Sequence, residues 1–212
     1  MTEIKINIPK SSKPSGQAVY VMLGFGFDEI EALGPVDVLR RAGMDVFTVS
    51  MVDNRLVKGA TGNLVVADMG LPEFKPKVSD WIIFPGADKS EAAVNLNDEL
   101  KAIVMNHWSN GGNIAAICAA PALVLGPLGI INGVKATGYP FLREDFEKRG
   151  GVYSEEPVVV GERLITSKGP GTTLEFALAI VRQVKGAETE KALRDGMVIP
   201  GQNCGQNCCC AD

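Results

Sequence analysis

The sequence predicts an α/β protein whose largely parallel sheet is covered by helices on both faces. Short apolar runs, such as Ala18–Leu23 and residues 114–117, alternate with segments of helical character. Each run is apolar throughout, which is typical of parallel strands that are buried on both faces. A third observation is Cys118, which follows the run at 114–117 and precedes Pro121, at a strand-to-helix turn.

The length of 212 residues corresponds to one large domain or two small ones. No composition shift or internal repeat interrupts residues 18–199, so we expect one domain over that range. Residues 1–17 mix Lys, Ser, Pro and Gly and are expected to form a mobile tail. Residues 200–212 carry no fold signal and are expected to form a second, cysteine-rich tail.

Charge and hydropathy exclude several classes of protein. A net charge of -4 without any basic run argues against nucleic acid as a partner. No stretch approaches the roughly 20 apolar residues of a membrane span, and the first 17 residues lack the apolar core of a secretory signal. Four of the five cysteines lie in the last nine residues, where they cannot staple a domain. We therefore expect a reducing, cytoplasmic setting.

The first half of the chain is predicted to contain four strands and two helices. The strand 18–23 leads through a glycine-rich loop to a helix that Asp28 or Glu29 opens and that Gly43 follows as its C′ residue. Asn97 caps a second helix, which runs to about Asn110. The other expected elements are a strand at 45–51, a loop at 54–62, a short strand at 64–67 and a buried strand at 80–84.

The second half starts with the central strand at 114–117 and the turn at Cys118. A helix is expected to continue through 122–125, because Pro121 suits a first helical turn. Gly161 and Glu162 read as the turn of a hairpin between 158–160 and 163–167. The remaining expected elements are a strand end at 135–138, a short helix at 141–149 and helices at 173–185 and 188–196.

Cys118 is the candidate nucleophile. At a strand-to-helix turn a nucleophile is held clear of the sheet, and free N–H groups at the helix start stabilise a thiolate. Such a position lowers a thiol pKa from about 8.5 to as little as roughly 3.5–7.5. The alternative is a buried cysteine that packs as a small hydrophobe. The loops after 84 and after 138 also follow strand ends, so several loops are expected to converge on the thiol.

Three separated motifs are residues 35–43 (Pro-Val-Asp-Val-Leu-Arg-Arg-Ala-Gly), the turn at 115–121, and residues 166–172 (Thr-Ser-Lys-Gly-Pro-Gly-Thr). Together they resemble the ThiJ/PfpI superfamily, and most closely its DJ-one (parkinsonism-associated deglycase) branch. The resemblance covers about residues 18–197. It implies a flavodoxin-like (Rossmann-like) three-layer sandwich, a homodimer, and a glutamate on the first helix that hydrogen-bonds the cysteine. By register that glutamate is Glu31; without the resemblance it is one of several acids near a helix start.

The sequence departs from the family pattern at two positions. PfpI-type members have histidine directly after the cysteine, where this chain has Ala119. The DJ-one branch usually has histidine before the proline of a later loop, where this chain has Tyr139. His107, the only histidine, is expected at the far end of the central strand, as a helix-end cation or a packing residue beside Trp108. A Cys–His pair is therefore not expected.

The resemblance implies addition of the Cys118 thiolate to methylglyoxal, glyoxal or early glycation adducts of amines or thiols. Glu31 would move protons between adjacent carbons, and no metal or cofactor is required. Tyr139 is expected to donate a hydrogen bond to substrate, or else to fill the space of the histidine. The expected oxyanion- and substrate-binding positions are Gly86, Ala87, Ala119 and Pro170.

A rival interpretation is a redox-sensing or chaperone-like protein whose Cys118 is oxidised to a sulfinate that Glu31 stabilises. The tail cysteines leave three alternatives open: an oxidisable end, S-acylation that tethers the chain to a membrane, or binding of a soft metal. These tail cysteines are Cys204, Cys208, Cys209 and Cys210.

Overall fold

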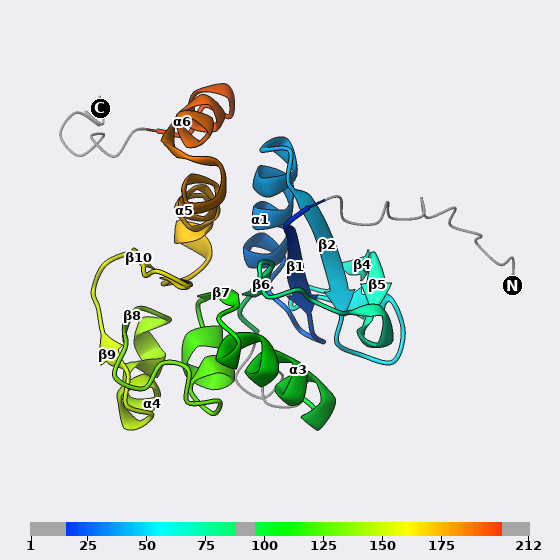
Figure 1. Cartoon of the computed structure of the whole chain (residues 1–212), viewed down its shortest axis with the longest axis vertical. Coiled ribbons are helices and arrows are strands. Elements are labelled where there is room, and N and C mark those ends of the chain that lie inside the picture. The colour runs from blue at the N-terminus through cyan, green and yellow to red at the C-terminus, as the bar shows by residue number, and fades with distance from the viewer. Residues whose placement is uncertain (1–15, 88–95, 201–212) are drawn as a thin grey trace, which may run out of the picture.

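The computed structural model describes residues 16–87 and 96–200, and its centre is a seven-stranded sheet with the strand order β10-β11-β7-β6-β1-β2-β5 (Figure 1). All neighbouring pairs in this sheet are parallel except β10 with β11. The strands are β1 (Ala18–Leu23), β2 (Asp45–Ser50), β5 (Met69–Gly70), β6 (Trp81–Phe84), β7 (Asn113–Ile117), β10 (Val158–Val160) and β11 (Leu164–Ser167). The predicted largely parallel sheet is therefore confirmed.

Helices cover both faces of the sheet, and each face has its own apolar core. On one face, α1 (Glu29–Arg41) and α5 (Thr173–Lys185) pack on the strands, and α6 (Ala187–Gly196) packs on α5. On the other face lie α3 (Asp98–Ser109) and α4 (Arg143–Lys148). Figure 1 shows the two sets of helices on opposite sides of the strands. The sheet with its two helical layers forms a three-layer sandwich, as predicted.

Side-chain caps and a glycine set the helix ends near the sheet. Asp28 Oδ1 accepts hydrogen bonds from the amides of Ile30 and Glu31 at 2.9 and 3.1 Å, which fixes the start of α1. Gly43 follows the end of α1 with φ +68°, a left-handed conformation that suits glycine. Asn97 caps α3 by accepting from the amide of Leu100. All three assignments agree with the sequence-based expectation.

Of the four short strands outside the main sheet, those within 64–67 and 135–138 were expected, whereas the other two were missed. Residues 54–62 were expected to be a loop, but β3 (Leu56–Lys58) pairs there with β4 (Leu64–Val66) in an antiparallel hairpin. A further pair, β8 (Lys135–Ala136) with β9 (Val152–Tyr153), lies outside the main sheet. Strands of two or three residues have too few positions for a periodicity to appear, so pairing with another segment decides them.

The helix expected after Cys118 is present over the expected residues, but it is only a short π-helical turn. Residues Pro121–Leu125 form a π-helical turn, in which the amide of Gly126 donates to the carbonyl of Pro121, and turns follow up to residue 133. Glycine at position 126 permits this irregular path, because a side chain there would collide with the Ala122 carbonyl. The segment is too short to contribute a substantial helix dipole beneath the thiol.

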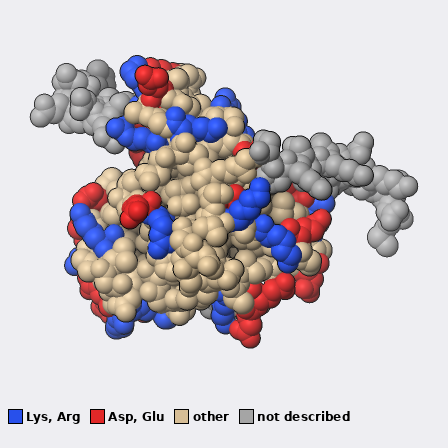
Figure 2. All heavy atoms as spheres, in the orientation of Figure 1, with Lys and Arg blue, Asp and Glu red and all other residues tan. Residues whose placement is uncertain are grey.

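The surface shows no concentration of one sign of charge on the face drawn in Figure 2, where basic and acidic side chains are interspersed. Within the described ranges, no helix is long and apolar enough to cross a membrane. The two tails expected at 1–17 and 200–212, including all four tail cysteines, lie almost wholly outside the described residues.

Candidate active site

The predicted site residues meet where the parallel strands end. Glu31 follows β1 on the first helix, Gly86 follows β6, and Cys118 follows β7 directly. From β1 the chain continues to β2 on one side and later to β6 on the other, which makes the gap between β1 and β6 a topological switch point. Ligand sites of open α/β sheets lie at such points.

The backbone of Cys118 is held in an unusual conformation by two other segments. Its φ is 63°, one of two positive values at non-glycine residues among those described. The Cys118 amide donates to the Ser167 carbonyl at 2.9 Å, and the Cys118 carbonyl accepts from the Tyr139 amide at 2.7 Å. A non-glycine residue with a positive φ costs about 1–3 kcal/mol. The hydrogen bonds to the neighbouring strand and loop therefore hold Cys118 in this conformation.

Glu31 is buried directly beside the thiol, with 0% of its surface exposed. Its Oε2 accepts a hydrogen bond from the Gly86 amide at 2.7 Å, whereas its Oε1 has no hydrogen-bond partner within the described residues. Gly86 is required at this point, because a Cβ there would lie 2.5 Å from Glu31 Oε2 and 3.0 Å from Cys118 Sγ. The chain therefore brings a carboxyl and a thiol together across a glycine.

Burial governs the protonation of both groups. Loss of hydration raises the pKa of Glu31 to about 7, with a smaller contribution from the negative charge of Asp28. Burial also raises the pKa of the Cys118 thiol, and the charge of Glu31 raises it further, while the Ala119 amide opposes this by a hydrogen bond to sulfur. When Glu31 is ionised, the proton of the pair therefore stays on sulfur.

Two sequence-based expectations about this chemistry are wrong. The thiol pKa is raised rather than lowered, because burial beside a carboxylate outweighs the single amide and because no long helix begins at the turn. The Gly86 amide is not free to bind an oxyanion, because it donates to Glu31. It instead holds the carboxyl in position beside the sulfur.

A cavity of about 440 Å³ opens over the sulfur, and the other predicted binding residues line it. These residues are Gly86, Ala87, Ala119, Tyr139 and Pro170. The hydroxyl of Tyr139 makes no hydrogen bond with any described residue, and the residue is 37% exposed. Every residue proposed from the sequence for the site except Glu31 thus lines one cavity, and Glu31 lies buried behind it beside the sulfur.

Sequence reasoning did not identify Asp28, Ala60, Phe141 and Leu142 as further lining residues. Asp28 was read only as a helix start, and Ala60 comes from the missed hairpin region. Phe141 was assigned to a short helix, where an apolar residue is expected to face the core, yet its side chain is 87% exposed. Residues 139–141 follow the expected strand end at 135–138, and this position and the resemblance at Tyr139 are the two signals that pointed to this loop.

His107 lies away from the thiol, as predicted. It is 2% exposed, and its Nε2 is 3.2 Å from the carbonyl of Asn113, the first residue of β7, whereas Cys118 follows the last. Burial lowers the pKa of His107 below its ordinary value of 6.5. His107 is therefore a neutral packing residue, and its alternative as a helix-end cation is wrong.

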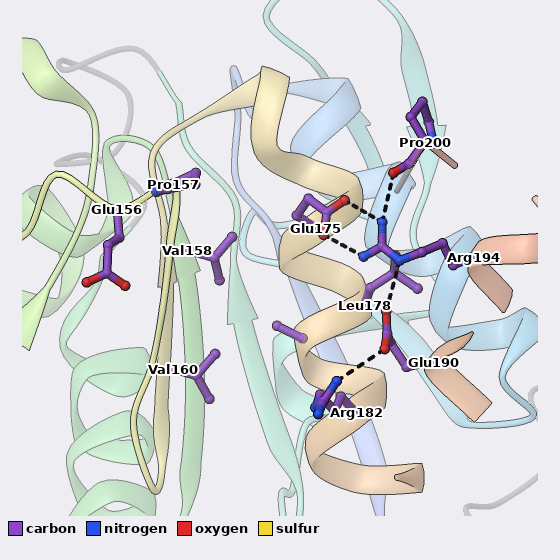
Figure 3. A pocket seen from close by; sticks show the side chains of 11 residues that line it. Glu156, Pro157, Val158, Val160, Glu175, Leu178, Arg182, Glu190, Arg194 and Pro200 are labelled. Atoms are coloured by element: carbon purple, nitrogen blue, oxygen red, sulfur yellow. Dashed lines mark hydrogen bonds and ion pairs between the residues drawn. The ribbon is translucent and has the colours of Figure 1, made fainter. Parts of the chain in front are cut away.

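A larger hollow of about 720 Å³ lies between β10 and the helices α5 and α6. Most of its charged residues pair with one another: Arg194 bonds both oxygens of Glu175, at 2.8 and 2.6 Å, and also bonds Glu190 and the Pro200 carbonyl (Figure 3). No thiol or imidazole lines it. We attribute to this cluster the attachment of α6 to α5.

Within the described ranges, no three potential metal-ligating side chains come together.

Comparisons with known proteins identify relatives of the whole domain. A sequence profile of the DJ-1/PfpI family matches residues 17–183. "Protein DJ-1 homolog A" of Arabidopsis thaliana is 36% identical over 173 residues, which are 81% of this chain but only 44% of that protein. This chain therefore spans less than half the length of that relative. "Glutathione-independent glyoxalase DJR-1.2" of Caenorhabditis elegans is 36% identical over 169 residues, covering 78% of this chain and 87% of that protein.

Among solved structures, oxidized DJ-1 of Toxoplasma gondii matches with a TM-score of 0.79 at 32% identity, covering 86% of this chain and 98% of that chain. The expected flavodoxin-like fold is thereby confirmed.

Proposed function

The chain belongs to the DJ-1/PfpI family, and from that premise we propose that it is a glutathione-independent glyoxalase with related deglycase activity. Its substrates would be methylglyoxal, glyoxal or early glycation adducts of amines or thiols. The observation that carries the proposal is the buried Glu31 carboxyl, whose pKa is raised to about 7, beside the Cys118 sulfur in an open cavity. The name of the C. elegans relative supports the same activity.

In the first step Glu31 acts as the base for Cys118. Its carboxylate takes the thiol proton as Sγ adds to the aldehyde carbon, which converts the carbonyl oxygen to an oxyanion. A raised thiol pKa makes the base necessary, and it makes the sulfur a strong nucleophile once the proton has left. The proton then passes to the oxyanion and gives a neutral hemithioacetal.

In the second step the same carboxylate moves a proton between adjacent carbons. Removal of the proton from the hemithioacetal carbon gives an enediol, and return of a proton to the neighbouring carbon gives a thioester of Cys118. Water then hydrolyses the thioester, releasing the 2-hydroxy acid and the thiol. One carbon is oxidised and its neighbour reduced, so the balance requires no external oxidant or cofactor.

The other predicted residues take binding roles. Tyr139 offers an unpaired hydroxyl at the cavity wall and would donate a hydrogen bond to a substrate oxygen. A phenol does not act as a base at neutral pH as imidazole does, which leaves Glu31 as the general acid–base group. Gly86, Ala87, Ala119 and Pro170 would shape the wall against which the substrate lies.

The test of this function is turnover of methylglyoxal to lactate by the purified chain. Cys118→Ser is expected to lower kcat/KM by about 100-fold or more, because the nucleophile is lost. The matched control replaces Cys204, Cys208, Cys209 and Cys210 by serine together and is expected to retain the wild-type rate. Unchanged turnover in Cys118→Ser, or none in the wild type, would contradict the proposal.

A second candidate is a redox-sensing stress protein, for which the oxidized structure of the Toxoplasma gondii relative is the favouring observation. Cys118 is a free thiol within the described residues, and the unpartnered Glu31 Oε1 is available to hydrogen-bond an oxidised sulfur. Selective gain of two oxygen atoms at Cys118 under dilute peroxide, in a wild type without methylglyoxal turnover, would favour this candidate.

A homodimer is proposed over the start of α1. Ile30 and Leu33 of α1 are exposed, and so are Leu56 and Leu64 of the β3–β4 hairpin. The hairpin lies against the helix start, because Thr61 donates to Glu29 through both its amide and its hydroxyl. A second copy would remove these apolar side chains from water.

Ile30→Glu is therefore expected to shift the chain to the monomer mass in analytical ultracentrifugation at micromolar concentration. Val152→Glu places the same charge on an exposed apolar residue of β9 and should leave the mass unchanged. A wild type that sediments as a monomer would contradict the dimer.

The proposal also includes a single domain over residues 18–199 and a cytoplasmic location. The location is proposed because a free thiol suits a reducing compartment.

A further inference from the structure

The cavity over Cys118 is larger than the smallest proposed substrates require. Its volume is about 440 Å³, whereas a three-carbon oxoaldehyde displaces roughly 100 Å³, the share of three or four water molecules. The lining of the cavity is mainly apolar, with Ala60, Leu142 and Pro170 among its residues. The spare space therefore suits an apolar substituent rather than a polar one.

The charges at the cavity disfavour an anionic substituent. Asp28 lines the cavity, and Glu31 lies buried beside the sulfur. No lysine or arginine is among the described residues that line it. A carboxylate or phosphate on the substrate would lose hydration without meeting a counter-charge.

Two aromatic rings form a lip at the cavity, which we define as Tyr139 and Phe141. Their ring centroids lie 5.4 Å apart with the planes tilted by 49°. The Phe141 ring is 87% exposed although it borders the cavity. The lip is tied to the nucleophile, because the Tyr139 amide donates to the Cys118 carbonyl at 2.7 Å. A substrate ring that adds to this pair would cover apolar surface that is otherwise in water.

We propose that the site prefers α-oxoaldehydes with an uncharged aromatic substituent, of which phenylglyoxal is the simplest, and that Phe141 determines this specificity. The proposal rests on the proposed glyoxalase function and defines its substrate class. The aldehyde carbon would take the sulfur of Cys118 while the aryl ring lies against the lip.

The chemistry is the same balanced isomerisation. Sulfur adds to the aldehyde carbon, Glu31 transfers the proton from that carbon to the benzylic carbon, and water cleaves the thioester. Phenylglyoxal and water give mandelate and one proton, and no oxidant or reductant is consumed. The product can be measured directly, so loss of phenylglyoxal to arginine side chains is not mistaken for turnover.

The experiment compares kcat/KM of the full-length chain for phenylglyoxal, methylglyoxal and 4-carboxyphenylglyoxal, measured as the 2-hydroxy acid formed. We expect phenylglyoxal to be favoured over methylglyoxal by about 10-fold or more, the scale on which an apolar pocket discriminates. The carboxylated analogue, which has the same ring and a negative charge, is expected to react about 10-fold more slowly than phenylglyoxal.

Variants assign the preference to the lip. Phe141→Ala is expected to lower the ratio of kcat/KM for phenylglyoxal over methylglyoxal about 10-fold, and Phe141→Leu to lower it less. Val152→Ala shortens an exposed apolar side chain away from the cavity and should leave the ratio unchanged. Because the readout is a ratio, a general loss of folded protein does not move it.

The outcomes separate this proposal from the function on which it rests. Turnover of methylglyoxal without preference for phenylglyoxal would overturn the substrate class and leave the glyoxalase function standing. Equal losses for both substrates in Phe141→Ala would overturn the role of Phe141. Turnover of neither aldehyde by the wild type would overturn the glyoxalase function, and this proposal with it.

Discussion

Replacing Glu31 by glutamine is expected to lower kcat for methylglyoxal by about 100-fold or more while the fold survives, which is the usual scale of general acid–base catalysis. Glutamine can still accept from the Gly86 amide, which donates to Glu31 at 2.7 Å, but it cannot take the Cys118 proton. In the wild type, kcat/KM should rise with pH and level off above about 7, because the base must be ionised. That limb of the pH profile should be absent from the residual activity of the variant.

Glu29→Gln is the matched control for this prediction. Glu29 lies two residues earlier on α1, but its carboxylate faces the hairpin and accepts hydrogen bonds from Thr61 and Asn63. Its loss should leave kcat within about twofold of the wild type, because it does not touch the reacting atoms. Equal losses in the two variants, with circular dichroism unchanged, would contradict the assignment of Glu31 as the base.

The free energy of unfolding is expected to fall by about 3 kcal/mol between pH 4.5 and 7.5 on account of Glu31 alone. The pKa of Glu31 is about 7 in the folded chain and near 4.5 when unfolded. Between these values the folded state binds more protons than the unfolded state, so stability decreases as pH rises. Below pH 4.5 both states are protonated, and above pH 7 both are ionised, so this contribution is flat outside the window.

Urea unfolding of the wild type and of Glu31→Gln across this pH range measures the difference. The variant is expected to gain about 3 kcal/mol relative to the wild type from pH 4.5 to 7.5, because its amide does not ionise. Glu99→Gln removes an exposed carboxyl from the first turn of α3 and should give a flat difference. Parallel curves for the wild type and Glu31→Gln would show that the pKa of Glu31 is not raised.

Local sequence patterns predicted the frame of the site well, because that frame depends on neighbours along the chain. The apolar runs predicted the main strands, Asn97 predicted a helix cap, and the small residues around Cys118 predicted the turn. The family register supplied Glu31, which local reasoning could not separate from Asp28. Its distinguishing property is burial against the Gly86 amide, 55 positions along the chain, and no helical pattern contains that contact.

The errors have the same origin in contacts between distant segments. The thiol pKa was expected to be low from the turn alone, but the Glu31 carboxyl beside the sulfur raises it. Phe141 was expected only as the start of a short helix, yet the chain turns through Pro140–Leu142 so that its ring borders the cavity while Leu142 is buried. The type of a residue predicts only a preference for burial. Where two apolar residues are adjacent, the path of the backbone decides which of them is buried.

The hydrogen bond from the Cys118 amide to the Ser167 carbonyl implies an order of events during synthesis on the ribosome. β7 pairs with β11 on one side, so the turn after β7 gains its second anchor only when a strand about fifty residues later has emerged. At about 5–20 residues per second, this delay lasts roughly 3–10 seconds. The nascent chain therefore carries Cys118 outside its finished setting for that interval, and the candidate site is completed only after β11 has been synthesised.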